Sequence, residues 1–279
     1  FESNFTQTAG VLTVHGTSNT GSGVLFGNSK ITAMNAAVLN VNGASDSGNG
    51  IYGFVYNSNG ATALNVTDNA TVSLAGSSES GSGVAWGNGY LFDVAKVEVS
   101  GNGVLNIAGS STDGIGAYGH ATTNVSGNGA VNVDGTSVNS TGVQWGDSAY
   151  STKTNIYLSE QGAFNIHGSS SNGTGALTSA NLYETGSASL SMIGNSTNGT
   201  GASSSFTGNV SGNSTVDVTG RSATGTGVTL SGSNIAVSQD AKFDVAGTSA
   251  GSGNGVLFYG GNLQESGNAA VQIDGASQG

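Results

Sequence analysis

The residues that could do chemistry are few and scattered. The 279 residues include 16 acidic and 5 basic side chains, 3 histidines and no cysteine. Glycoside hydrolysis needs two carboxyl groups about 5 to 10 Å apart, and a nucleophilic serine needs a histidine beside it. Arg221 is the one arginine, and the candidate acids do not gather at one place in neighbouring repeats: Asp113, Asp134, Asp147, Asp217, Asp240 and Asp244. We therefore expect that the protein is not an enzyme.

The histidines and glycine-rich stretches indicate no metal or cofactor site. His15 and His167 occupy the same outward position of the repeat but lie five copies apart, and His120 lies after a turn at a different position. Calcium-binding nonapeptides of the GGxGxD kind are missing. The stretch GSGNG at 251–255 lacks the GK[ST] of a phosphate loop. We expect no metal and no cofactor.

A repeat of apolar-x-apolar-x-Gly carries these residues. It recurs ten times at spacings of 26 to 33 residues, and its anchor glycines are Gly16, Gly43, Gly76, Gly109, Gly135, Gly168, Gly194, Gly220, Gly247 and Gly275. All twenty residues two and four positions before these glycines are apolar. Because residues two apart lie on one face of a strand, each copy predicts a short strand with a buried face.

Two further apolar columns keep the same register. One lies eight residues after the glycine, as at Val24 and Ile51, and the other lies twelve and ten residues before the next glycine, as at Ile31 and Ala33. Glu184 and Glu265 interrupt the last column, where we expect a strand end or a local register shift. The glycines suit tight corners, where a positive φ is often required.

Three short strands per copy predict an all-β fold, a right-handed parallel β-helix of about ten rungs. Residues 1–279 would form one rod, with longer rungs at 43–75, 76–108 and 135–167. An antiparallel sandwich or barrel is the alternative, but its strands need no common register in ten copies. GVLF at 23–26 returns at 255–258, which predicts that the rod is a piece of a longer filament copied in blocks.

Three stretches carry a resemblance to a known family: GTSNTGSGVLFG, VSGNGVLNIAGSS and VTGRSATGTGVTLSG. They resemble the repeat region of the two-partner-secretion exoproteins of Gram-negative bacteria, such as filamentous haemagglutinin and EtpA-like adhesins. The resemblance covers essentially the whole chain. It implies a secreted rod at the bacterial cell surface, a virulence factor with an outer-membrane secretion partner and a host glycan or protein receptor.

Charge and composition exclude several partners. The net charge of −11 would repel a phosphate backbone or an anionic membrane, so we expect no nucleic acid partner. No apolar stretch is long enough to span a membrane, so we expect no membrane insertion. Two functions remain. The rod is either an adhesin that attaches to host cells or a structural spacer, able to self-associate, that presents a binding region located elsewhere.

The longer rungs are where a ligand site would be grafted. Their extra residues fall between the second and third strands and project along a single edge. Exposed aromatic and polar side chains suit recognition of carbohydrate or protein. The candidate ligand-binding residues are Phe54, Tyr56, Tyr90, Phe92, Asp93, Asp147, Tyr150 and Lys153. The alternative is that these segments are spacer loops whose aromatic rings lie back on the rod.

The tryptophans and the sequon asparagines each have a structural and a functional interpretation. Trp86 and Trp145 stand in a column where large and small residues alternate, which favours core packing over a sugar-binding platform. Ten Asn-x-Ser/Thr sequons make a glycoprotein conceivable, since some members of the resembled family are glycosylated. They are Asn4, Asn65, Asn69, Asn124, Asn139, Asn172, Asn195, Asn198, Asn209 and Asn213.

Overall fold

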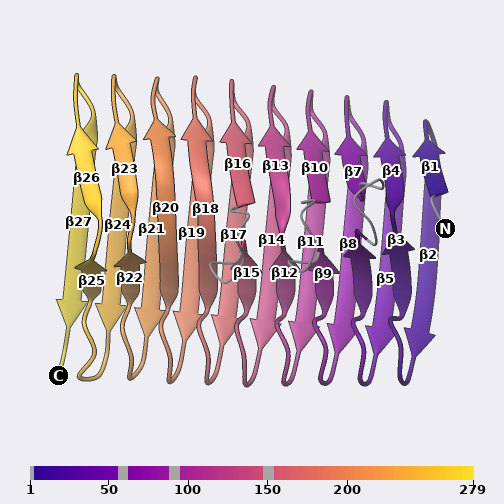
Figure 1. Ribbon diagram of the computed structural model, residues 1–279, viewed down its shortest axis with the longest axis horizontal. Helices are drawn as coiled ribbons and strands as arrows, with labels where there is room; N and C mark the ends of the chain where they lie inside the picture. Colours follow the sequence, from indigo (N-terminus) through magenta and orange to yellow (C-terminus); the bar gives the residue numbers. More distant parts are fainter. Residues whose placement is uncertain (1–2, 56–61, 88–94, 147–153) are drawn as a thin grey trace.

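A computed structural model describes residues 3–55, 62–87, 95–146 and 154–279, and these form an all-β rod without a helix (Figure 1). One side of the rod is a ten-stranded parallel sheet in which each strand pairs with its copy in the next repeat. Its strands are β2 (Val11–Ser18), β5 (Val38–Ser45), β8 (Thr71–Ser78), β11 (Val104–Ser111), β14 (Ala130–Ser137), β17 (Ala163–Ser170), β19 (Ser189–Ser196), β21 (Thr215–Ser222), β24 (Lys242–Ser249) and β27 (Ala270–Ser277).

The other strands belong to a seventeen-stranded sheet, also paired in parallel. In most copies, one strand of this sheet comes directly after a strand of the ten-stranded sheet. These strands are β3 (Val24–Gly27), β6 (Ile51–Phe54), β9 (Val84–Trp86), β12 (Ala117–Gly119), β15 (Val143–Trp145), β22 (Val228–Ser231) and β25 (Val256–Tyr259). A second strand comes directly before the next strand of the ten-stranded sheet. These strands are β1 (Ser3–Gln7), β4 (Ser29–Ala33), β7 (Ala63–Val66), β10 (Ala95–Val99), β13 (Ala121–Val125), β16 (Thr154–Leu158), β23 (Asn234–Val237) and β26 (Asn262–Glu265). In two copies a single strand, β18 (Ala176–Glu184) or β20 (Ala202–Val210), replaces these two strands.

The core follows the three predicted columns. In β8, Val72 and Leu74 are almost fully buried, and they pair in register with Leu105 and Ile107 of β11. The column of Ile31 and Leu64 is equally buried. Each parallel strand therefore needs only one apolar face, and stacking neighbours joins these faces into one continuous core.

The prediction that glycines provide positive φ at corners is confirmed at glycines such as Gly87, Gly101 and Gly146, but the anchor glycines have another role. None of the ten is among the glycines with positive φ, and Gly76 lies inside β8. A Cβ added at Gly76 would lie 2.0 Å from the carbonyl oxygen of Gly83, where the chain folds back against the strand. The same clash recurs at all but the last anchor glycine. A close backbone approach, and not a special dihedral angle, excludes a side chain here.

Serines two residues after the anchor glycines close the corner that follows. The hydroxyl of Ser45 donates to the carbonyl of Gly21, and that of Ser78 donates to the carbonyl of Gly48. The Ser78 hydroxyl also accepts a hydrogen bond from the amide of Gly81 at 2.9 Å. Small polar residues at matching turn positions thus satisfy backbone groups from copy to copy.

Two copies depart from the predicted three strands. At β18 and β20 the second and third strands form one continuous strand of nine residues. In most other copies a residue with positive φ separates the two strands, as Gly87, Gly146 and Gly232 do. No residue of β18 has a positive φ, so the chain passes from one sheet segment to the next in extended conformation.

Trp86 and Trp145 lie in the core, as predicted. Both side chains are completely buried, and they alternate in register with Gly53 and Gly119. A Cβ added at Gly119 would lie 2.3 Å from the six-membered ring of Trp145. Each glycine thus leaves the space that the neighbouring indole fills.

Candidate functional site

The three longer connections leave the rod at one edge. They join β6 to β7, β9 to β10 and β15 to β16. β6 pairs with β9, and β12 lies between β9 and β15, so the ends of these strands follow one another along the rod. The same holds for β7, β10 and β16, where the connections return, with β13 lying between β10 and β16. The predicted position of the extra residues, between the second and third strands, is confirmed.

Phe54 is the only candidate ligand-binding residue within the described residues. Its ring stacks on Tyr52, with ring centroids 5.1 Å apart, and covers Gly27 of the paired strand β3. It also lines a hollow of about 420 Å³ at the N-terminal end of the rod, together with Phe5, Val14 and Phe26. Its half-buried ring therefore packs back on the rod. Tyr56, Tyr90, Phe92, Asp93, Asp147, Tyr150 and Lys153 lie outside the described residues.

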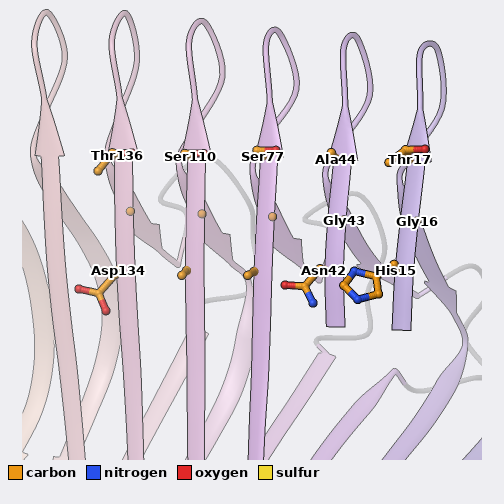
Figure 2. A pocket seen from close by; sticks show the side chains of 15 residues that line it. His15, Gly16, Thr17, Asn42, Gly43, Ala44, Ser77, Ser110, Asp134 and Thr136 are labelled. Carbon is orange, nitrogen blue, oxygen red and sulfur yellow. The ribbon is translucent and has the colours of Figure 1, made fainter. Parts of the chain in front are cut away.

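A shallow groove of about 620 Å³ runs along the outer face of the ten-stranded sheet, from β2 to β14. Figure 2 shows His15 and Asn42 next to each other at one end and Asp134 farther along the same face. The middle of the groove is lined by small residues such as Ala75 and Ala108. It offers a hydrogen-bonding group at each end and an apolar floor between them.

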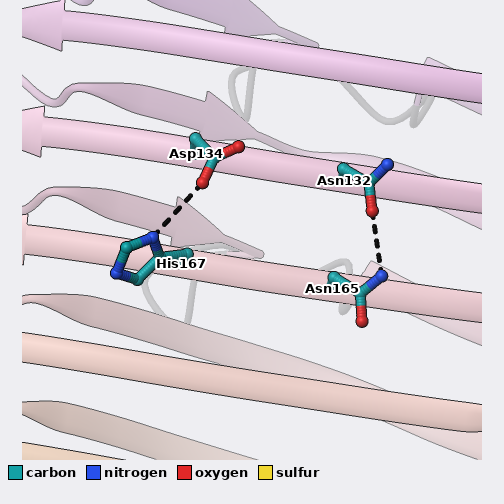
Figure 3. Close-up of polar contacts among 4 residues, drawn as sticks. All are labelled: Asn132, Asp134, Asn165 and His167. Carbon is teal, nitrogen blue, oxygen red and sulfur yellow. Dashed lines mark hydrogen bonds and ion pairs between the residues drawn. The ribbon is translucent and has the colours of Figure 1, made fainter.

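The histidines of this face lie in one column but are separated, as predicted. His15 pairs in register with Asn42, and His167 pairs with Asp134. Figure 3 shows the Nδ1 of His167 at 3.3 Å from the carboxylate of Asp134, beside a hydrogen bond from Asn165 to Asn132. Both members of the His167–Asp134 pair are more than half exposed. Among the described residues no three His, Asp or Glu side chains come together as a metal site would require.

The ten sequon asparagines all lie within the described residues, and none is buried. Asn139, Asn172 and Asn198 form a ladder in which each amide nitrogen donates to the preceding copy, starting at the carboxylate of Asp113. Asn4, Asn209 and Asn213 are exposed. The sequons thus include both ladder residues, whose amide nitrogens are already engaged, and freely accessible ones.

Sequence reasoning missed a pair of exposed tyrosines. Tyr157 on β16 and Tyr183 on β18 stack with ring centroids 5.0 Å apart and an interplanar angle of 10°. Their side chains are 43% and 37% exposed. The signal was present, because each tyrosine stands between two inward positions of the third column and therefore points outward.

A second missed feature is the burial of Glu184. The predicted strand end at Glu184 is confirmed, but there is no register shift, since Glu184 pairs with Leu158 and Val210. Its side chain is completely buried, and neither carboxyl oxygen has a hydrogen-bond partner. Burial raises the pKa of Glu184 well above its ordinary value, and the negative charge of Asp217 adds to this. Burial and the charge of Asp244 also raise the pKa of Asp217, against the opposing effect of Lys242.

No protein-family model, curated protein sequence or solved structure matches this chain. Within the described part of the chain, no helix could cross a membrane. The candidate site therefore depends on the geometry of the rod and on the resemblance of its repeats.

Proposed function

We propose that this chain is the repeat rod of a secreted bacterial surface adhesin, which attaches to a glycan or protein receptor on host cells. The proposed fold is a right-handed parallel β-helix of about ten rungs with three short strands each. The proposed parent protein is a longer repetitive exoprotein that is exported with an outer-membrane partner. The proposal includes no enzymatic activity, cofactor or nucleic acid partner.

The observation that carries the proposal is the alignment of the longer connections. A parallel stack with unbroken register forms a rigid scaffold, and all three interruptions of its repeat emerge along one edge. Loops on a rigid scaffold are where binding residues most often lie. In sequence, the interrupted segments contain Tyr90, Asp147, Tyr150 and Lys153.

The test compares the intact chain with a shortened variant. In the variant, the segments 87–96 and 146–155 are reduced to the pattern of the 26-residue copies. We expect the intact chain to bind host cells or a glycan array, and the shortened variant to lose most of that binding while keeping its circular dichroism spectrum. Equal binding by both chains would overturn the loop-edge site.

A structural spacer is the second candidate, favoured by a different observation. The outer surface carries extended ladders of small polar side chains, such as Asn106, Asn132 and Asn165, which stabilise neighbouring copies and use the groups that a ligand would need. A rod that serves as a spacer would bind neither cells nor glycans, with or without the longer connections. The same pair of chains therefore distinguishes the two functions.

A further inference from the structure

The outer side of β16, β18, β20, β23 and β26 forms an uncharged polar face, which we call the amide face. Its outward side chains stand in two columns in register from strand to strand. These are Asn155, Asn181, Thr207, Asn234 and Asn262 in one column and Tyr157, Tyr183, Asn209, Ala236 and Gln264 in the other. No member carries a charge, although the chain as a whole has a net charge of −11.

One part of this face is concave. A hollow of about 270 Å³ is lined by Thr207, Asn209, Asn234, Ala236, Asn262 and Gln264. Ala236 stands between Asn209 and Gln264 in its column, so its short side chain leaves a gap between two longer ones. This volume is just below the range of about 300 to 1,000 Å³ that is usual for drug-sized ligands, so the hollow suits a single sugar ring.

An aromatic ring stands one strand away from the hollow. Tyr157 covers one face of the Tyr183 ring, and since β18 lies between β16 and β20, the other face is turned toward Asn209. Tyrosine combines an apolar ring face with a polar tip. The C–H groups of a sugar ring can pack on such a face while its hydroxyls reach neighbouring polar groups.

The amides around the hollow are available to a ligand. Among the four amide side chains that line the hollow, which all belong to the described residues, only that of Asn234 donates a hydrogen bond, to the carbonyl of Gly232 at 3.0 Å. Asn209, Asn262 and Gln264 are exposed, and each offers both a donor and an acceptor. Sugar hydroxyls require that combination, because each is itself a donor and an acceptor.

We propose that the amide face binds an uncharged saccharide, with Tyr183 as the stacking platform and Asn209, Asn262 and Gln264 as hydrogen-bonding groups. Acidic saccharides are disfavoured because the face holds no cation and the net negative charge of the chain repels them. This inference deepens the proposed attachment function, on which it rests, by naming a ligand class at a second surface, whose hollow lies on β20, β23 and β26, beyond the last of the longer connections.

The test starts with an array of uncharged and sialylated glycans, followed by calorimetric titration of the best-bound uncharged glycan. Tyr183→Ala should weaken binding at least about tenfold, and Ala236→Lys, which fills the hollow, should abolish it. Tyr183→Phe should retain binding within about twofold because the ring face remains. Tyr259→Ala is the matched control, since Tyr259 is an exposed tyrosine on β25, away from this face.

Several outcomes would overturn the inference. They are failure of the intact chain to bind any uncharged glycan, unchanged affinity in both Tyr183→Ala and Ala236→Lys, or equal weakening by Tyr259→Ala. Sedimentation velocity tests for a further contrary outcome. If the intact chain binds no glycan but self-associates, and Tyr183→Ala abolishes this self-association, the face is an interface between copies of the chain. The variant with shortened connections changes Asn155 at the margin of the face but keeps Tyr183 and every residue that lines the hollow. It should therefore still bind the glycan, so failure of the loop-edge site is measured separately.

Discussion

Two neighbouring stretches of the rod fill the same interior columns with different chemistry. From β9 to β15 the interior holds two buried indoles, Trp86 and Trp145, with Gly119 between them. From β18 to β20 the same column holds Thr178 and Ser204, which are also buried, and their hydroxyls have no hydrogen-bond partner. The first stretch carries longer connections, whereas the second runs through its corners without a break.

This difference shows what the repeat requires and what it leaves free. Pairing in register is kept throughout, because every strand must match its two neighbours. The filling of the interior and the length of the corner both vary. The two insertions of the first stretch directly follow the buried indoles of Trp86 and Trp145, whereas the second stretch has no insertion and buries Phe206. We infer that the two indoles, the largest fully buried side chains, make the stretch from β9 to β15 the more stable one. The stretch from β18 to β20, which buries the carboxyl group of Glu184 without a partner, is then the weaker part of the rod.

Removal of an indole should have the largest effect. Trp145→Ala empties a fully buried site beside Phe164 and should lower the free energy of unfolding by about 3 to 5 kcal/mol. Ser204→Ala, in the same column two strands away, should change it by less than about 1 kcal/mol because a hydroxyl without a partner is removed. Urea denaturation of both variants measures the contrast, and equal losses would refute it.

The glycine that faces this indole should come next. Gly119→Ala places a methyl group against the Trp145 ring and should cost about 1 to 3 kcal/mol. Combining it with Trp145→Leu, which frees the space, should cost less than the sum of the two single changes. A double-mutant cycle from urea denaturation tests this, and strict additivity would show that the two residues do not share the site.

In the weaker stretch, Glu184→Leu should stabilise the rod. The substitution replaces a buried carboxyl group without partners by the side chain found at the paired Leu158. A gain of about 1 to 3 kcal/mol at neutral pH follows from removing an unsatisfied buried group. Thermal unfolding of the variant checks the sign, and a loss of stability would mean that the carboxyl group has partners in solution.

The same residue predicts a dependence on pH. Because the pKa of Glu184 is raised in the folded chain, folding favours the protonated form. Its contribution to stability is fully present below the unfolded pKa of about 4.3 and is lost as the pH rises toward the folded value. The stability of the native chain relative to Glu184→Gln should therefore fall over this interval and then stay constant. A difference that rises with pH would contradict the assignment.

The smallest effect is expected on the surface. His167 and Asp134 are both exposed, so Asp134→Asn should cost no more than about 0.5 kcal/mol, and less in high salt. Chemical denaturation at two salt concentrations measures this. A loss above about 1 kcal/mol would place the pair among the main supports of the ten-stranded sheet.

Much of the fold could be predicted from periodicity alone. The columns through Val72 and Leu74 repeat at a fixed distance from a glycine, and a parallel stack turns that distance directly into register. The burial of Trp145 followed from the small residues on either side of it in its column. The positions of the longer connections followed from copy lengths, since the other two turns of each longer copy keep their length.

The rest depends on contacts that periodicity does not encode. The role of Gly76 depends on a carbonyl seven residues later, and the fusion of strands in β18 depends on the dihedral angles of one corner. Glu184 is buried because Leu158 and Val210 hold the register on both sides, whatever the residue between them prefers. The tyrosine pair could have been found, because alternation with buried neighbours already turned Tyr157 and Tyr183 outward.

The most direct measurement of the central claim is the attachment of three chains to the same host cell surface. They are the intact chain, the variant with segments 87–96 and 146–155 shortened, and that variant with residues 147–153 inserted between Ser179 and Ala180 of β18. We predict strong attachment by the first, weak attachment by the second and partial recovery by the third. Equal attachment by the first two, with both folded, would contradict the claim that the connections form the attachment edge.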